Sequence, residues 1–224
     1  MSHATLATPP RDPRLDVLRG WMQLCIFVSH VAGTVFGWFI PAAWGFSDSS
    51  EQFLFLSGLG LGSVFALKAA RGGTGVALRD LAWRMGRLWR VHLVVVVAFG
   101  AVVVLADQFL VPGEVERLGW CALLAAPWLV LPTALGLHQP EFTGILPSFL
   151  FGMLLLPLLM LGLARFGAWA MLVPVGLYLG VQATGWTLPA VAGEFAFDPI
   201  AWQVIFLGGA FLGWRLLREG RAVG

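Results

Sequence analysis

Long apolar runs alternate with short polar segments over most of this chain. A helix needs about 20 apolar residues to cross roughly 30 Å of hydrocarbon. Six runs approach or exceed that length: residues 17–40, 51–70, 91–111, 144–163, 169–183 and 200–217. The pattern therefore predicts an all-α fold, a polytopic transmembrane helix bundle with six spans.

The composition supports a membrane protein rather than a soluble one. Hydrophobic residues make up 58% of the chain and charged residues 12%, and the mean hydropathy is +0.83. A soluble surface needs more charge than this. The net charge of +2 does not indicate nucleic-acid binding, because the Lys and Arg residues lie in blocks beside apolar runs, as the positive-inside rule describes.

The Lys and Arg residues concentrate around the connection between the second and third runs. That region holds Lys68, Arg71, Arg79, Arg84, Arg87 and Arg90, whereas residues 42–50 hold no Lys or Arg. Cytoplasmic loops carry an excess of these residues, so the basic connection is predicted to be cytoplasmic. We therefore predict that both termini are cytoplasmic, with residues 1–14 as a polar tail and residues 15–224 as a single integral membrane domain.

The apolar run over residues 121–137 is shorter and contains Pro127 and Pro132. If this run crossed the membrane, Arg165 and the C-terminal arginines would lie outside, against the positive-inside rule. If it stays on the periplasmic side, these basic residues become cytoplasmic. We therefore predict that residues 121–137 form a periplasmic interfacial or re-entrant helix.

Polar side chains form a stripe on the first apolar run. At about 100° per residue, Asp16, Arg19, Gln23 and His30 project within roughly 60° of one another. Polar groups inside a membrane are costly and mark functional sites, so we hypothesise that His30 is a general base and that Arg19 holds an anionic donor near the cytoplasmic end. The alternative is a helical ion pair between Asp16 and Arg19, with His30 bonded to a neighbouring helix.

The second run begins with two carboxylates. Asp48 and Glu51 have the spacing of a capping box, in which an N-cap side chain and the residue three positions later bond each other's backbone. Glu51 is also expected to lie about 10 Å from His30, counted along an antiparallel helix pair. The sequence leaves both roles open, capping and catalysis, for the two carboxylates.

Glycines lie at helical spacing in both of the first two runs. Gly58 and Gly62 share a face with Glu51, and Gly33 and Gly37 extend the polar stripe of the first run. Small residues let membrane helices approach closely. We therefore expect the two pairs of glycines to face each other.

A third group of polar residues precedes the third run. Arg84, Arg87 and Arg90 recur every three residues between tryptophans, and His92 follows just inside the predicted span. This pattern is typical of an interface anchor that attracts anionic lipid. The alternative is that the arginines bind the phosphates of a nucleotide-like donor and that His92 faces the same cavity. The sequence has no Cys/His cluster with metal-ligand spacing, so we expect no metal site.

Several blocks of the sequence resemble the OpgC family, which belongs to the membrane acyltransferase-3 superfamily. They are Arg11–Gly20, Ser29-His30, Gly45–Glu51, Phe53–Gly58, Trp89–Leu93, Ile145–Pro147 and Phe197–Gln203. The blocks follow the family order over most of the chain. Arg19 and His30 match the Arg-x10-His signature of the superfamily.

The resemblance implies a multi-pass enzyme of the bacterial inner (cytoplasmic) membrane. Such an enzyme transfers an acyl group, typically succinyl, from a cytoplasmic acyl-CoA such as succinyl-CoA to a glucose hydroxyl of osmoregulated periplasmic glucans. The expected partners are therefore acyl-CoA, a periplasmic glucan and membrane lipid. No nucleic acid is expected.

The resemblance also implies roles for the candidate residues. His30 would be the general base, with Arg19 as its partner on the cytoplasmic side and Asp16 beside it. Asp48 and Glu51 would be carboxylates on the acceptor side. The CoA phosphates would be held by basic residues of the third group: Arg84, Arg87 and Arg90, with His92 nearby.

The sequence departs from the family pattern at two points. Gly144 precedes the Ile-Leu-Pro block, where family members usually have an acidic residue, although Glu141 is close. The family bundle has about ten helices, so the six predicted here would be a partial bundle. Two alternatives therefore stand beside the acyltransferase: a transport or export subunit whose polar stripe lines a path, and an inactive fragment of such an enzyme. Binding of acyl-CoA would distinguish an acyltransferase from an exporter.

Overall fold

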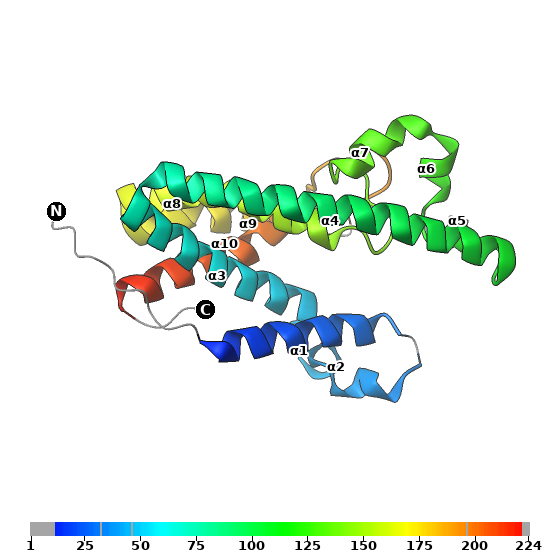
Figure 1. The fold of residues 1–224 in the computed structure, drawn as a ribbon, viewed down its shortest axis with the longest axis horizontal. Coiled ribbons are helices and arrows are strands. Elements are labelled where there is room, and N and C mark those ends of the chain that lie inside the picture. Colours follow the sequence, from blue (N-terminus) through cyan, green and yellow to red (C-terminus); the bar gives the residue numbers. More distant parts are fainter. Residues whose placement is uncertain (1–11, 32, 46, 196, 221–224) are drawn as a thin grey trace. The chain divides into compact units, whose positions relative to one another are not determined.

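A computed structural model describes residues 12–31, 33–45, 47–195 and 197–220. These residues form helices and connecting loops, and no strand occurs among them (Figure 1). The α-helices are α1 Pro13–Ser29, α2 Pro41–Trp44, α3 Ser49–Gly72, α4 Thr74–Phe109, α5 Glu114–Arg117, α6 Cys121–Ala125, α7 Val130–Ala134, α8 Ile145–Phe166, α9 Leu172–Thr184 and α10 Pro199–Arg218. The 3-10 helices are η1 Val35–Phe39, η2 Pro127–Leu129 and η3 Gly167–Met171. The predicted all-α class is confirmed.

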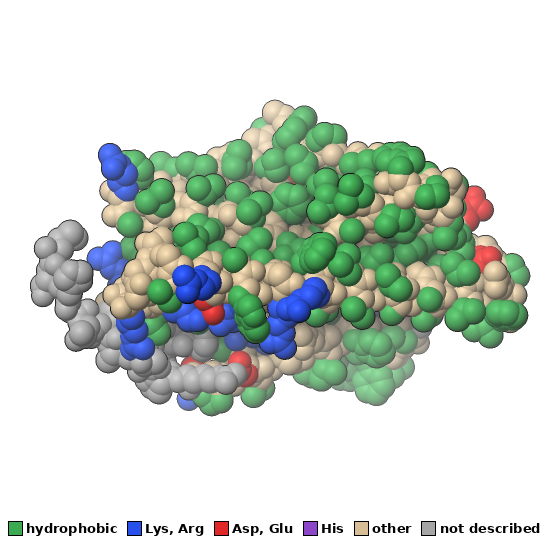
Figure 2. Space-filling view, turned by 45° about the horizontal axis from the view of Figure 1, so that its top comes forward, with side chains coloured by type: hydrophobic (Ala, Val, Ile, Leu, Met, Phe, Trp, Pro, Cys, Tyr) green, Lys and Arg blue, Asp and Glu red, His purple; other side chains and the backbone are tan. Residues whose placement is uncertain are grey.

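Within the described residues, 4 helical segments are long and apolar enough to cross a membrane. They are Ser49–Gly72, Thr74–Phe109, Ile145–Thr184 and Pro199–Arg218. Hydrophobic side chains also cover much of the face shown in Figure 2, and large hydrophobic residues on several helices are exposed. These features indicate a membrane protein, whose exposed apolar side chains would contact lipid.

The chain divides into two compact units. The first consists of Met1–Leu81, Leu155–Val175 and Val204–Gly224, and the second of Ala82–Leu154 and Gly176–Gln203. The first unit holds α1, α3 and most of α10. The second holds most of α4, the short helices α5 to α7, and the loop that leads to α10.

α3 and α10 cross closely within the first unit. A Cβ atom added to Gly58 would overlap the carbonyl oxygen of Phe206, and one added to Gly62 would overlap the backbone of Ala210. The two backbones are therefore in direct contact, as small residues at four-residue spacing allow. Figure 1 shows the two helices crossing.

The partner that we predicted for this glycine face was wrong. Gly33 and Gly37 have no atom within 4 Å of an added Cβ, so they do not face Gly58 and Gly62. The reason is a second small-residue pair with the same spacing on α10: Gly209 and Gly213.

The first apolar run, residues 17–40, does not form the single helix that we predicted. α1 ends at Ser29, with His30 as its C-cap. Gly33 has φ +75°, a left-handed conformation that favours glycine and interrupts a helix. Thr34 then accepts a hydrogen bond from the Phe36 backbone N–H (3.3 Å) and starts η1. The structure also begins α1 at Pro13, N-capped by Asp12, so the last residues of the predicted tail are helical.

The segment Ile145–Thr184 contains a turn between α8 and α9. Gly167 has φ +61°, and a Cβ on Gly162 would lie 3.0 Å from the Cβ of Ala170. Residues eight positions apart on a straight helix are about 12 Å apart. The chain therefore bends back near Gly167, between the predicted runs over residues 144–163 and 169–183.

The run over residues 121–137 is not one helix either. It consists of α6, η2 and α7, each no longer than 5 residues. Pro127 has no N–H and disfavours helical geometry at the residue before it, and Ala126 has φ −129° and ψ 83°. The prolines thus divide the run into pieces too short to cross a membrane.

The second unit packs around Val103, Leu118 and Trp120, which are all buried. Asp107, near the end of α4, accepts hydrogen bonds from the backbone N–H groups of Gly113 (2.9 Å) and Val115 (3.0 Å). These bonds fix the turn that brings α5 and Leu118 back toward α4.

Candidate functional site

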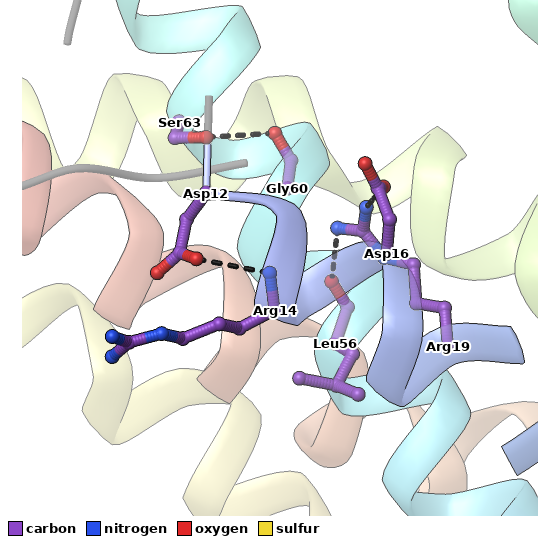
Figure 3. A network of polar contacts seen from close by, with 7 residues as sticks. All are labelled: Asp12, Arg14, Asp16, Arg19, Leu56, Gly60 and Ser63. Atoms are coloured by element: carbon purple, nitrogen blue, oxygen red, sulfur yellow. Dashed lines mark hydrogen bonds and ion pairs between the residues drawn. The ribbon is translucent and has the colours of Figure 1, made fainter. Parts of the chain in front are cut away.

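Arg19 connects α1 to α3 in the first unit. Its Nη2 donates to the carbonyl oxygen of Leu56 (3.0 Å), and its Nη1 lies 3.4 Å from Oδ1 of Asp16 (Figure 3). The side chain of Arg19 is 24% exposed and that of Asp16 is 38% exposed. The helical ion pair that we considered is therefore present, and the same guanidinium also binds the neighbouring helix.

A groove of about 460 Å³ lies beside this contact. Its lining comes from α1, α3 with the loop before it, and α10, and consists of Leu18, Met22, Ser47, Glu51, Gln52, Phe55, Leu56 and Ile205. The polar lining residues all lie between positions 47 and 52, whereas the rest of the wall is apolar. Leu56, whose carbonyl oxygen binds Arg19, is part of this wall, and Glu51 lines the same groove.

Asp48 and Glu51 form the capping box that was one of their two predicted roles. Oδ1 of Asp48 accepts from the N–H groups of Ser50 (2.5 Å) and Glu51 (3.1 Å), and Oε2 of Glu51 accepts from the N–H of Asp48 (3.2 Å). These bonds satisfy backbone donors at the start of α3. Glu51 also lines the groove, whereas Asp48 is exposed at the helix start.

His30 lies at the end of α1 rather than in the middle of a helix. Its backbone N–H donates to the carbonyl of Phe27 (3.1 Å), and its side chain is exposed. Arg19 and His30 are connected by continuous helix as far as Ser29, which separates them by about 16 Å along α1. Gln23, the other member of the stripe, is also exposed.

The three arginines of α4 lie on exposed positions of the second unit. The guanidinium of Arg87 is 6.0 Å from the ring centroid of Trp83, and Nε of Arg90 donates to the carbonyl of Gly86 (3.3 Å). Both contacts are within α4 and are compatible with an interface anchor. Arg84 is exposed as well.

His92 is not on the same surface as these arginines. It is 1% exposed, and its Nε2 lies 2.9 Å from the carbonyl oxygen of Thr133. A carbonyl only accepts, so Nε2 carries the proton. Trp89, one turn earlier, donates to the carbonyl of Ala134 (2.8 Å). The two side chains thus bond carbonyls at the end of α7, and His92 does not share an open cavity with the arginines.

His138, to which no sequence pattern assigns a role, is buried beside Thr133. Oγ1 of Thr133 donates to the carbonyl of Leu129 (2.7 Å) and lies 2.8 Å from Nδ1 of His138. Since the hydroxyl has one proton, Nδ1 of His138 must be the donor. No local pattern signals this burial, because it depends on the loop folding back over α7.

Burial lowers the pKa of His138 below its ordinary value of 6.5. The unfolded loop therefore binds a proton more readily than the folded loop, and the stability that the neutral ring contributes is complete above pH 6.5 and is lost as the pH falls below it. We expect faster amide hydrogen exchange over residues 130–144 at pH 5 than at pH 7, after correction for intrinsic exchange rates. The variant His138→Asn keeps a donor for Thr133 but does not titrate, so its corrected exchange should not change between these pH values. An equal acceleration in this variant would contradict the assignment.

The family comparison covers nearly the whole chain. A family model described as OpgC protein matches residues 11–223. Neither the comparison with curated proteins nor that with solved structures finds a match. The matched range contains the Arg19–Leu56 contact, the groove and the start of α3, so these features belong to the part of the chain that the family model describes. The chain belongs to the OpgC family.

Proposed function

We propose that this protein is a membrane O-acyltransferase. It would transfer an acyl group, with succinyl as the expected group, from a cytoplasmic acyl-CoA to a hydroxyl of a periplasmic glucan. The observation that carries this proposal is the groove in the first unit, whose wall includes Glu51 and the carbonyl-bearing Leu56 to which Arg19 is bound. A carboxylate on the groove wall, with a cation bonded to a residue of that wall, suits a reaction between an anionic donor and a sugar hydroxyl.

The proposed chemistry is a direct acyl transfer. His30 accepts the proton of the acceptor hydroxyl as its oxygen attacks the thioester carbonyl carbon. The new ester C–O bond forms, the C–S bond breaks, and the leaving thiolate of CoA takes up the proton that His30 accepted. Arg19 contributes positive charge near the donor, and Glu51 accepts hydrogen bonds from acceptor hydroxyls.

The break after α1 supports a functional position for His30. Residues 17–40 are an apolar run, yet the helix stops at Ser29 and resumes as η1 only at Val35. Irregular backbone at membrane depth is tolerated where it is buried in protein or lines a water-filled cavity. We infer that the segment around His30 lines such a cavity, which an acceptor from the periplasm would enter.

The proposed orientation places the protein in the bacterial inner membrane with both termini in the cytoplasm. In addition to the four apolar segments, it requires α1 to cross and the turn at Gly167 to separate two crossings, which gives six. The pieces of residues 121–137 would then lie at the periplasmic surface. The exposed arginines of α4 would face the cytoplasm, where Arg84, Arg87 and Arg90 would contact the phosphates of CoA.

We expect the variant Arg19→Gln to reduce acyl transfer about 10- to 100-fold, because a hydrogen bond to a charged group contributes about 1.5–3 kcal/mol. The measurement uses inverted vesicles that contain the protein, with glucan in the lumen and radiolabelled succinyl-CoA outside. Transfer of label to the glucan and the affinity for succinyl-CoA are both recorded. Arg19→Lys keeps the charge with fewer donors and should have intermediate activity.

Arg14→Gln is the matched control, since it removes the same charge from an exposed position at the start of the same helix. Its transfer rate should equal that of the unaltered protein. If the unaltered protein neither binds succinyl-CoA nor labels the glucan, the acyltransferase proposal is wrong and an export role is favoured. If Arg19→Gln and the control behave alike, Arg19 has no part in the reaction.

A further inference from the structure

A second groove of the first unit lies at the end of α10. It has a volume of about 330 Å³ and is lined by one residue of η3, four of α10 and the residue that follows α10: Ala168, Phe211, Trp214, Arg215, Arg218 and Glu219. No sequence pattern assigns these residues a binding role, and none of them lines the groove beside Arg19. The lining combines aromatic rings with two guanidinium groups.

One guanidinium of the groove, that of Arg218, lies over an aromatic ring. The guanidinium carbon of Arg218 lies 4.8 Å from the centroid of the Trp214 ring, and that ring stacks on Phe211 at 6.1 Å with an interplanar angle of 26°. An aromatic ring accepts no conventional N–H hydrogen bond, so a guanidinium over its face keeps N–H donors for an anion. The contact with Trp214 therefore positions Arg218 at the groove.

The charges at the groove leave an excess of one positive charge among its lining residues. Arg215 donates from Nε to Oε1 of Glu219 at 2.9 Å. This pair is exposed, with 63% and 43% of the two side chains accessible, so it is weak in solution. Nε is only one of the donor positions on Arg215, so its guanidinium can bind an anion while the pair persists.

The position of the groove indicates which anion it would bind. The helix Pro199–Arg218 is one of the four segments long and apolar enough to cross a membrane, and Arg215 and Arg218 are in its last turn. The end of a spanning helix lies at the level of the lipid headgroups, where Trp and Arg are favoured. We propose that this groove binds the phosphate of an anionic phospholipid, with Arg218 and Arg215 on the phosphate and with Phe211 and Ala168 against the glycerol and upper acyl chain.

A lipid explains the groove better than a free anion does. Ala168 and Phe211 supply an apolar surface next to the two cations, and a free phosphate would gain nothing from that surface. An anionic lipid has both a phosphate and an apolar body, and basic residues near a membrane surface attract it. The groove would thus anchor the end of α10, whose other contacts include the close crossing with α3.

The test is retention of lipid by the purified protein. The full chain is extracted in mild detergent, incubated with equal amounts of dioleoylphosphatidylglycerol and dioleoylphosphatidylcholine, and examined by native mass spectrometry. The unaltered protein should retain phosphatidylglycerol preferentially. The double variant Arg215→Gln/Arg218→Gln should lower that retention about tenfold or more, since each basic residue contributes to the attraction. Arg218→Lys, which keeps the charge but loses the planar donor set, should give an intermediate value.

The control is Arg14→Gln/Arg79→Gln, which removes two exposed arginines of the same unit that do not line the groove. It should retain phosphatidylglycerol within about twofold of the unaltered protein. Equal losses in both double variants, or equal retention of the two lipids, would overturn the proposal. Competition by millimolar inorganic phosphate, or by CoA, would also overturn it, because the groove would then be a site for a free anion or a nucleotide.

Discussion

His30→Ala should reduce the initial rate of acyl transfer about 10²- to 10⁴-fold, the range that a positioned general base contributes. His30 is at the C-cap of α1 with its side chain exposed, so its truncation removes little buried surface and should leave the protein folded. The rate is measured with succinyl-CoA and glucan in inverted vesicles. The affinity for succinyl-CoA should change little, because the imidazole acts on the acceptor.

The adjacent residue provides the control. Ser29 is also exposed, and its Oγ donates to the carbonyl of Ile26 (2.7 Å) within α1. Ser29→Ala should therefore transfer succinyl at the normal rate. Retention of activity within twofold by His30→Ala, at equal membrane abundance, would show that the proton is accepted elsewhere. A loss of succinyl-CoA affinity without a change in the maximal rate would place His30 on the donor side instead.

Gly209→Ala should destabilise the protein by about 1–3 kcal/mol or more, the usual cost of inserting atoms into a close-packed interface. A Cβ at this position would overlap the carbonyl oxygen of Phe55. Backbone atoms of α3 cannot move aside as a flexible side chain can, so α3 and α10 would have to separate. The free energy of unfolding is measured by titrating the protein with denaturing detergent in mixed micelles.

Gly208→Ala is a closely matched control for this variant. It is the preceding residue of the same helix, and nothing lies within 4 Å of an added Cβ. Alanine is a better helix former than glycine, so this variant should be neutral or more stable by up to about 1 kcal/mol. Opposite signs are therefore expected at adjacent positions. Equal effects of the two substitutions would mean that α3 and α10 are not in backbone contact.

Some of the candidate site could be recognised from local sequence. The Asp48-x-x-Glu51 pattern predicted a capping box, because the bonds of a capping box join groups only three residues apart. The pairing of Asp16 with Arg19 could be predicted for the same reason, because these two residues are also three positions apart. The second bond of Arg19, to Leu56 on another helix, could not be derived from spacing along α1.

The errors in the prediction all concern contacts or interruptions that periodicity does not report. Gly58 and Gly62 were correctly taken as a packing face. Further glycine pairs at this spacing include Gly33/Gly37 and Gly209/Gly213, and the spacing alone does not show which of them contacts that face. Residues 17–40 and 121–137 were read as single helices because their hydropathy is continuous. A left-handed residue after His30 and the prolines of the second run break them, although the apolar composition does not change.

The sequence by itself determined the helical class, the apolar segments, the capping at the start of α3 and the motifs of the OpgC family. These properties depend on residues within a few positions of each other or on composition along one helix. Only the tertiary structure decided that α10 is the partner of α3, that Arg19 binds Leu56 beside the groove, and that His92 is bonded to α7. Each of these is a contact between residues more than 30 positions apart. Such contacts depend on which surfaces fit together, and the periodicity of one helix does not specify its partner.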